Sequence, residues 1–113
     1  MKPTDKTWPW YMTVAALREF MRLAGYAGGP EDDNPYFDRA EAELGALCAG
    51  ATHIPGHTTR SGAEIYRSAW SRIGPGVRVR VRLEFTVQHA PPGARADGEK
   101  PQLVRVRVKA RRP

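Results

Sequence analysis

The alternating segment from residue 77 to residue 89 constrains the fold of this chain more than any other feature. Its apolar residues alternate with polar ones, in the order Val77, Arg78, Val79, Arg80, Val81, Arg82, Leu83, Glu84, Phe85, Thr86, Val87 and Gln88. Because successive side chains of a β-strand point to opposite faces, this pattern predicts a long strand with one apolar face and one polar face.

A second alternating segment runs from Gln102 to Lys109. Its side chains are expected on two opposite faces. One face carries Val104, Val106 and Val108, and the other carries Leu103, Arg105, Arg107 and Lys109. The loop 90–101, which is rich in Pro and Gly, joins the two segments, so we expect them to form an antiparallel pair. A further strand is expected between Ala63 and Ile73, before the turn residues Gly74, Pro75 and Gly76.

The residues before this sheet predict two helices. In the first, Thr13 is a suitable N-cap and Gly25 a suitable C-terminal stop, and one face carries Val14, Leu17, Phe20, Met21 and Ala24. In the second, Asn34 is the expected N-cap and Pro35 the first helical residue, and one face carries Phe37, Ala40, Leu44, Leu47 and Ala51.

A chain of 113 residues is long enough for one domain and too short for two. We expect an aromatic N-terminal arm over 1–12, two helices within 13–51 and an antiparallel sheet over 63–110, interrupted by the loop 90–101. The predicted fold class is α+β, with two N-terminal helices packed on one face of a three- to four-stranded antiparallel sheet.

The positive charge of the chain lies in its second half. The formal net charge is +6, but residues 1–56 carry five basic and eight acidic side chains, whereas residues 57–113 carry thirteen basic and four acidic ones. If the two alternating strands pair with their valines together, their other face carries Arg78, Arg80, Arg82, Arg105, Arg107 and Lys109, with Glu84 as the acidic residue among them.

Like charges opposite each other on a sheet are destabilising. Binding of a nucleic acid compensates this cost, because phosphates release counterions when arginines neutralise them. Each phosphate can also accept two parallel hydrogen bonds from a guanidinium group. The sequence therefore favours a small basic protein that binds RNA or DNA through backbone contacts of these six residues, with little sequence specificity. The alternatives are a solvated charged face or protection of a sheet edge. Trp70 and Tyr66 are expected beside this face or in the core.

A metal-independent ribonuclease is a second hypothesis. The titratable candidates are His53, His57, Glu64, Tyr66, Glu84 and His89, and such an enzyme needs a base, an acid and a cation. The loop from Thr52 to Gly62 leads into the strand that carries Tyr66, so the expected catalytic set is His57, Arg60 and Tyr66. Two helices followed by a basic sheet resemble, in element order alone, the RelE-like and barnase-like ribonuclease toxins, and this resemblance implies RNA cleavage. The sequence favours a binding protein over an enzyme.

A protein-interaction or assembly subunit without catalytic activity is the third hypothesis. Trp8 and Trp10 flank a proline near the N-terminus, and they predict either packing over the end of the core or an exposed surface that binds a partner. The long valine strand also offers an edge for pairing with a second copy, so a homodimer is a further expectation.

The remaining features indicate a soluble cytoplasmic protein with no membrane partner, no metal and no cofactor. Cys48 is the one cysteine, so an internal disulfide is excluded. It adjoins the apolar face of the second helix, and this placement favours a buried free thiol over a metal site formed with His53 and His57. No segment is long and apolar enough for a signal peptide or a bilayer span.

Overall fold

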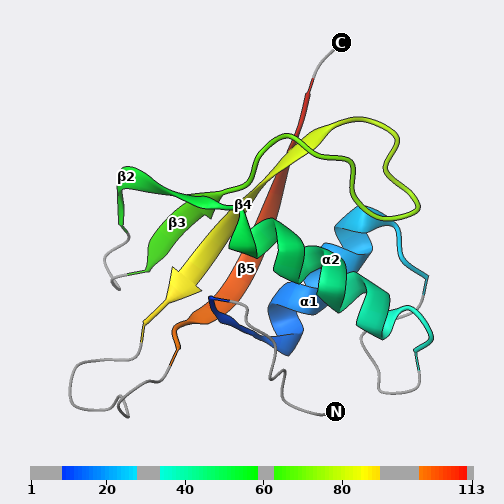
Figure 1. Cartoon of the computed structure of the whole chain (residues 1–113), viewed down its shortest axis with the longest axis horizontal. Coiled ribbons are helices and arrows are strands. Elements are labelled where there is room, and N and C mark those ends of the chain that lie inside the picture. The colour runs from blue at the N-terminus through cyan, green and yellow to red at the C-terminus, as the bar shows by residue number, and fades with distance from the viewer. Residues whose placement is uncertain (1–8, 28–33, 59–62, 90–99, 112–113) are drawn as a thin grey trace.

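The computed structural model describes residues 9–27, 34–58, 63–89 and 100–111, with the backbone alone over 55–58. Its elements follow the order β1 (Tyr11–Met12), α1 (Val14–Ala24), α2 (Phe37–Ala49), β2 (Thr52–Thr58), β3 (Glu64–Arg67), β4 (Val81–Gln88) and β5 (Gln102–Ala110). The strands form one sheet in the order β1-β5-β4-β3-β2, and both helices lie on the same side of it (Figure 1).

The α+β class and the packing of two helices on one sheet face are confirmed. The predicted strand number and the all-antiparallel arrangement are wrong, because the sheet has five strands and β1 pairs with β5 in parallel. The helices are also preceded by β1. The strand β2 contains Pro55 and Gly56, which predicted a loop. It lies at the sheet edge, and both residues fall in the irregular stretch between the paired residues His53 and Thr58, where a proline is tolerated.

The first helix begins and ends as predicted. The Thr13 hydroxyl accepts a hydrogen bond from the Ala16 N–H (3.1 Å) and donates one to the Leu103 carbonyl (2.9 Å), so the cap also attaches α1 to β5. Gly25 ends the helix in the left-handed conformation (φ 78°). Val14 was expected in the core, but it is 55% exposed and Ala16 takes the buried position.

The second helix begins two residues later than predicted. Asn34 does not cap it, because the Asn34 side chain accepts a hydrogen bond from the Tyr36 N–H (2.8 Å) and closes a turn before Phe37. The predicted apolar face is otherwise confirmed at Phe37, Ala40 and Leu44, which are all buried.

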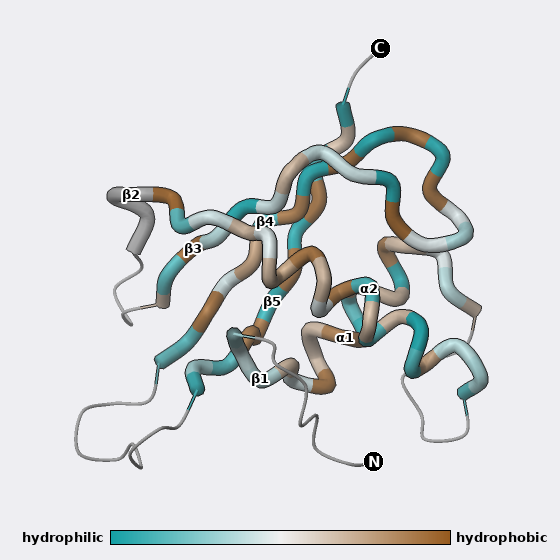
Figure 2. Tube along the Cα trace, in the orientation of Figure 1, coloured by the Kyte–Doolittle hydropathy of each residue, from teal (hydrophilic) through white to brown (hydrophobic). Residues whose placement is uncertain are grey.

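The strand β4 is shorter than the alternating pattern that predicts it. Its buried residues Val81, Leu83, Phe85 and Val87 confirm the apolar face, and Figure 2 shows this hydrophobic alternation along β4. Residues 77–80, however, are not part of the strand. The preceding glycines pack against the end of α1, where the Gly76 N–H donates to the Ala24 carbonyl (3.1 Å), and this contact directs the chain away from the sheet.

A bulge shifts the register between β4 and β5. Thr86 pairs with Arg105 but Val87 pairs with Leu103, so Val104 is an extra residue on β5. Leu103 is fully buried and therefore belongs to the core face, contrary to the prediction. The Glu19 carboxylate of α1 accepts a hydrogen bond from the Val106 N–H (2.6 Å), next to the bulge.

The strand expected over 63–73 is also shorter. After β3 ends at Arg67, the Ser68 N–H still donates a hydrogen bond to the Leu83 carbonyl of β4 (2.9 Å), and an isolated bridge joins Ser71 to Val81. Among the described residues, no helix has the length and apolar character needed to cross a bilayer.

Candidate nucleic-acid interface

The face of the sheet opposite the helices carries a cluster of cations. In the register of β3, β4 and β5, Arg82 lies directly opposite Lys109, Glu84 lies between Arg67 and Arg107, and Thr86 lies opposite Arg105. We call this surface the outer basic face, and its cations are Arg67, Arg82, Arg105, Arg107 and Lys109. It unites four of the six predicted residues and adds Arg67, which the alternating pattern of the longer strands did not indicate.

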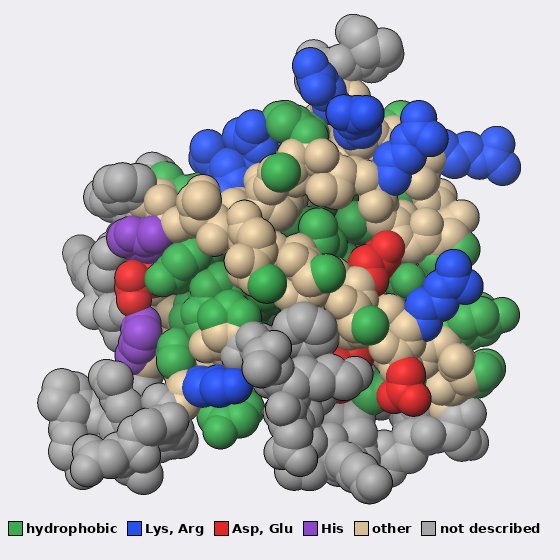
Figure 3. Space-filling view, viewed as in Figure 1, with side chains coloured by type: hydrophobic (Ala, Val, Ile, Leu, Met, Phe, Trp, Pro, Cys, Tyr) green, Lys and Arg blue, Asp and Glu red, His purple; other side chains and the backbone are tan. Residues whose placement is uncertain are grey.

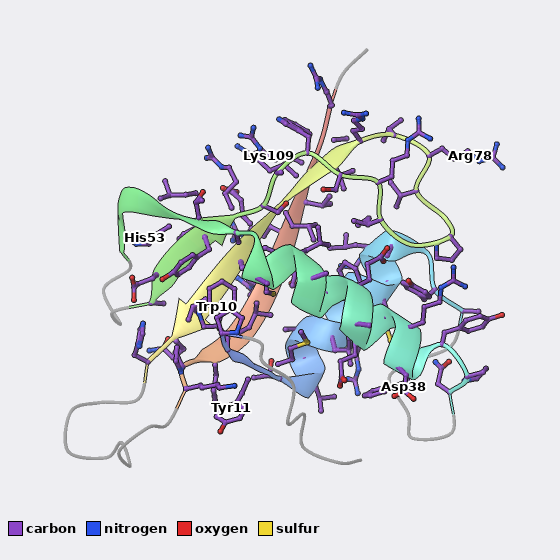
Figure 4. The ribbon with its side chains drawn as sticks, in the orientation of Figure 1. Trp10, Tyr11, Asp38, His53, Arg78 and Lys109 are labelled. Atoms are coloured by element: carbon purple, nitrogen blue, oxygen red, sulfur yellow. The ribbon has the colours of Figure 1, made fainter. Side chains whose placement is uncertain are left out.

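The other two predicted cations, Arg78 and Arg80, are not on the sheet. Both are exposed residues of the irregular segment before β4. The Arg80 carbonyl accepts a hydrogen bond from the Arg111 N–H (3.0 Å), so Arg80 lies beside the end of β5. Figure 4 shows Arg78 at the far side of this segment from Lys109, and Figure 3 shows Lys and Arg side chains along the same rim of the molecule.

Trp70 lies at the margin of the outer basic face. The Arg82 guanidinium is 4.6 Å from the centre of the Trp70 ring, and the Arg111 guanidinium is 5.8 Å from it. Cation–π contacts of this kind hold an arginine side chain in one orientation. The face therefore has an aromatic ring beside it, and of the two positions expected for Trp70, beside this face or in the core, Trp70 takes the first.

The charges of this face are only partly compensated. Arg67 forms an ion pair with Glu84 (Nη2 to Oε2, 3.9 Å). The Nε atoms of Arg67 and Arg82 are buried and have no hydrogen-bond partner among the described residues. A buried N–H group without an acceptor is costly.

Tyr66 lies on the opposite, helix-covered side of the sheet. It pairs with Phe85, and its ring centre is 4.6 Å from that of Trp10 and 5.2 Å from that of His53. Burial and the nearby Glu64 charge raise the pKa of the Tyr66 phenol. Tyr66 therefore does not flank the outer basic face.

The positions of Trp10, β4 and Cys48 bear on the partner and metal hypotheses. Trp10 is only 6% exposed and packs against Tyr66 and Phe85, so it is a core residue and does not offer an exposed partner-binding surface. The strand β4 lies inside the sheet, so it is not an edge for dimerisation. Cys48 is the buried free thiol that the sequence predicted, and burial raises its pKa to about 12.

Part of the predicted catalytic set lies outside the described residues. Nothing is described of Arg60, of the His57 side chain or of Trp8. The structure instead brings together three titratable groups that the sequence named separately, namely His53, Glu64 and His89. Both imidazoles contact the Glu64 carboxylate, through Nε2 in each case. No group of three or more potential metal ligands is arranged around one point over the described ranges.

No known protein family, curated protein or solved structure matches this chain.

Proposed function

We infer that this protein binds nucleic acid through the outer basic face, by contacts to the phosphate backbone with little sequence preference. The observation that carries this inference is the direct pairing of Arg82 with Lys109, together with Arg105 and Arg107 on the same face. Like charges at opposed positions of a sheet destabilise the fold, so selection for stability alone disfavours them. The same charges strengthen the binding of a polyanion.

The arrangement of Arg82 supports the same ligand class. Its guanidinium is held against Trp70, 4.6 Å from the centre of the ring. An orientated guanidinium forms two parallel hydrogen bonds with a phosphate at a smaller cost in side-chain entropy. Trp70 also adds an aromatic ring at the margin of this face, and stacking of an unpaired base on such a ring favours a single strand over a duplex.

The test is fluorescence anisotropy of labelled single-stranded RNA and DNA, titrated with the full chain at several salt concentrations between about 50 and 300 mM. We expect the affinity to fall steeply with salt. We expect Arg107→Ala to weaken binding and to reduce the slope of log K against log salt by about 0.7, the value for one lost phosphate contact on a single strand.

Arg18→Ala is the matched control, because it removes the same charge from an exposed position on α1, on the helix side of the sheet. It should leave the slope nearly unchanged. The proposal is wrong if affinity is insensitive to salt, or if both substitutions have equal effects. A duplex competitor that displaces the single strand at equal concentration would contradict the stacking role of Trp70.

A further inference from the structure

Four cations follow one another along the outer side of β5. Arg105, Arg107 and Lys109 alternate with core-side residues of the strand. Arg111 continues the alternation, because its N–H donates to the Arg80 carbonyl (3.0 Å) in the register of the strand pair. All four side chains are exposed. We call Arg105, Arg107, Lys109 and Arg111 the β5 row, and Figure 1 shows the end of β5 that carries Lys109 extending beyond the helices.

The bulge in β5 ends the row at Arg105. Thr86 pairs with Arg105 but Val87 pairs with Leu103, so the bulge turns the Leu103 side chain into the core, where it is fully buried. Gln102, the next residue outside the core, is neutral. The row therefore has four consecutive cationic positions and does not continue past the bulge.

Rows that cross the sheet are less suited to a polyanion than the row along β5. Glu84 lies between Arg67 and Arg107 and forms an ion pair with Arg67 (Nη2 to Oε2, 3.9 Å). Arg105 lies opposite the neutral Thr86. Along β5, by contrast, no acidic residue stands between the cations, and no member of the row forms an ion pair with a carboxylate of the described ranges. An extended polyanion therefore meets the most uncompensated positive charge along β5.

The spacing of the row fits the phosphates of an extended single strand. Side chains on one face of a strand recur every two residues, at about 6.8 Å. The same number of backbone bonds separates alternate Cα atoms of a protein and adjacent phosphorus atoms of a nucleic acid, so the two extended chains have similar repeats. One cation can therefore face each successive phosphate. The phosphates of a duplex strand wind about the helix axis and diverge from such a row.

Trp70 lies at the Arg111 end of the row. Its ring centre is 5.8 Å from the Arg111 guanidinium and 4.6 Å from that of Arg82, which lies opposite Lys109. The ring is partly exposed. It is therefore within reach of a base that is attached to a phosphate bound at the last positions of the row, and such a base can stack on it.

We propose that a single strand of nucleic acid binds along β5, with four consecutive phosphates on the four cations of the β5 row and one base against Trp70. This inference rests on the proposed function and adds to it the path and the length of the bound strand. Because the phosphates face the protein, the bases away from Trp70 point to solvent. The preferred ligand is an extended, unpaired strand with at least four phosphates.

The test is a length series of thymidine oligonucleotides with one to eight internucleotide phosphates. The full chain is titrated in competition with a labelled strand at several salt concentrations. The slope of log K against log salt should grow by about 0.7 with each phosphate up to four and then stay near about 2.8. A slope that levels off at two phosphates overturns the path along β5, and so does one that still grows in proportion to length from five to eight.

Two variants of the row should change the series in different ways. Arg105→Gln removes the cation at one end, so the slope should level off at three phosphates, near about 2.1. Lys109→Gln removes an inner cation, so the slope should reach the same limit but still level off at four phosphates. Identical series for the two variants would contradict the order of contacts along β5.

Two further substitutions are the matched controls. Arg78→Gln removes an exposed cation from the irregular segment before β4, away from Lys109 (Figure 4), and should leave the series unchanged. Arg67→Gln removes a cation from the same face but from β3, where Glu84 compensates it, and should change the slope by less than half as much as Arg105→Gln. Equal reductions for Arg67→Gln and Arg105→Gln would show that the strand crosses the sheet.

The contact with Trp70 has a signature of its own. Stacking releases no counterions, so Trp70→Ala should lower the affinity about fivefold or more without changing the slope, and Trp70→Phe should retain most of the affinity. A lower slope with unchanged affinity at low salt would overturn the stacking role.

The length series also separates this inference from the proposed function. If no strand of any length binds with an affinity that depends on salt, the proposed function is wrong and the path along β5 with it. If the longer strands bind with a steep salt dependence but the slope does not level off at four phosphates, only the path is wrong. Circular dichroism checks the fold of each variant, and the wild-type series needs no variant.

Discussion

At the scale of single residues, burial decides which chemistry each side chain can perform. Trp10 is an aromatic residue near the N-terminus that the sequence allowed either in the core or on a partner surface, and the structure buries it against Tyr66 and Phe85. Cys48 is buried in the same core, where its thiol is held in the neutral form. By contrast, His53 and His89 stay accessible, although nothing in their local sequence distinguishes them from ordinary surface residues.

The Cys48 thiol predicts a loss of stability at alkaline pH. Burial raises its pKa from 9.0 to about 12, so the thiol ionises in the unfolded chain before it does so in the folded one. The free energy of unfolding should therefore be unaffected by this group below pH 9 and should fall between pH 9 and pH 12, by at most about 1.4 kcal/mol per pH unit. Urea unfolding at several pH values measures this decrease.

Cys48→Ala separates the thiol from the tyrosines, which also titrate in this range. The pKa of Tyr26 is raised to about 12 by burial and by its hydrogen bond to Glu43, so both proteins should lose some stability above pH 10. The variant should show a shallower decrease than the wild type from pH 9 upwards. Parallel curves for the two proteins would contradict the assigned burial of Cys48.

At the scale of secondary-structure elements, contacts from the helices determine the register and the ends of the strands. Glu19 of α1 accepts a hydrogen bond from the Val106 N–H beside the bulge of β5. The turn before β4 is held by the close approach of Gly74 and Gly76 to the end of α1. Both contacts join segments that are distant in the sequence, so a strand pattern read locally predicts neither the bulge nor the late start of β4.

Glu19→Ala should destabilise the protein by about 1–3 kcal/mol, because it leaves the Val106 N–H without its acceptor. Glu19→Gln retains a carbonyl oxygen at the same place and should cost less than half as much. Urea unfolding measures both differences, and amide hydrogen exchange at Val106 should accelerate in the alanine variant only. Equal effects of the two substitutions would show that the hydrogen bond does not hold the bulge.

Gly74→Ala should destabilise the protein by about 2 kcal/mol or more. Gly74 has a φ of 57°, and an added Cβ would lie 2.2 Å from the Ala24 carbonyl oxygen, so both backbone strain and a clash with backbone oppose the substitution. Gly50→Ala is the control, since the nearest atom to its added Cβ is 3.9 Å away, and its effect should stay within about 1 kcal/mol. Thermal unfolding compares the two, and similar melting temperatures would argue against the close packing of this turn.

At the scale of the whole molecule, the two faces of the sheet have different properties. One face is covered by the helices over most of its area and carries the His53, Glu64 and His89 cluster at its uncovered end. The other carries the five cations of the outer basic face around Glu84. Positive charge is therefore concentrated on the outer basic face, where the mutual repulsion of the cations lowers the stability of the fold.

This accumulation predicts that salt stabilises the protein. Screening weakens the repulsion between Arg82 and Lys109, so the melting temperature should rise by a few degrees between about 20 and 300 mM NaCl. Lys109→Glu replaces the repulsion with an attraction and should raise the melting temperature at low salt, flatten its salt dependence and weaken the binding of nucleic acid. Arg18→Glu on α1 is the control. A wild-type melting temperature that falls with added salt would contradict the prediction.

The sequence by itself determined the α+β class, the two helices with the Thr13 cap and the Gly25 stop, and the apolar faces of β4 and α1. These features depend on periodicity and on local backbone chemistry, which neighbouring residues specify. The strands β1 and β2, the bulge at Val104 and the departure of Arg78 and Arg80 from the sheet were decided only by tertiary structure.

The same distinction applies to the candidate sites. Alternation alone identified Arg82, Arg105, Arg107 and Lys109 as neighbours, because the side-chain period of two holds along each strand. Arg67, Trp70 and the cluster of His53, Glu64 and His89 are brought into place by pairing between strands that are far apart in the chain. Their convergence depends on register and on packing against the helices, which are properties of the folded chain as a whole and are not encoded in any single segment.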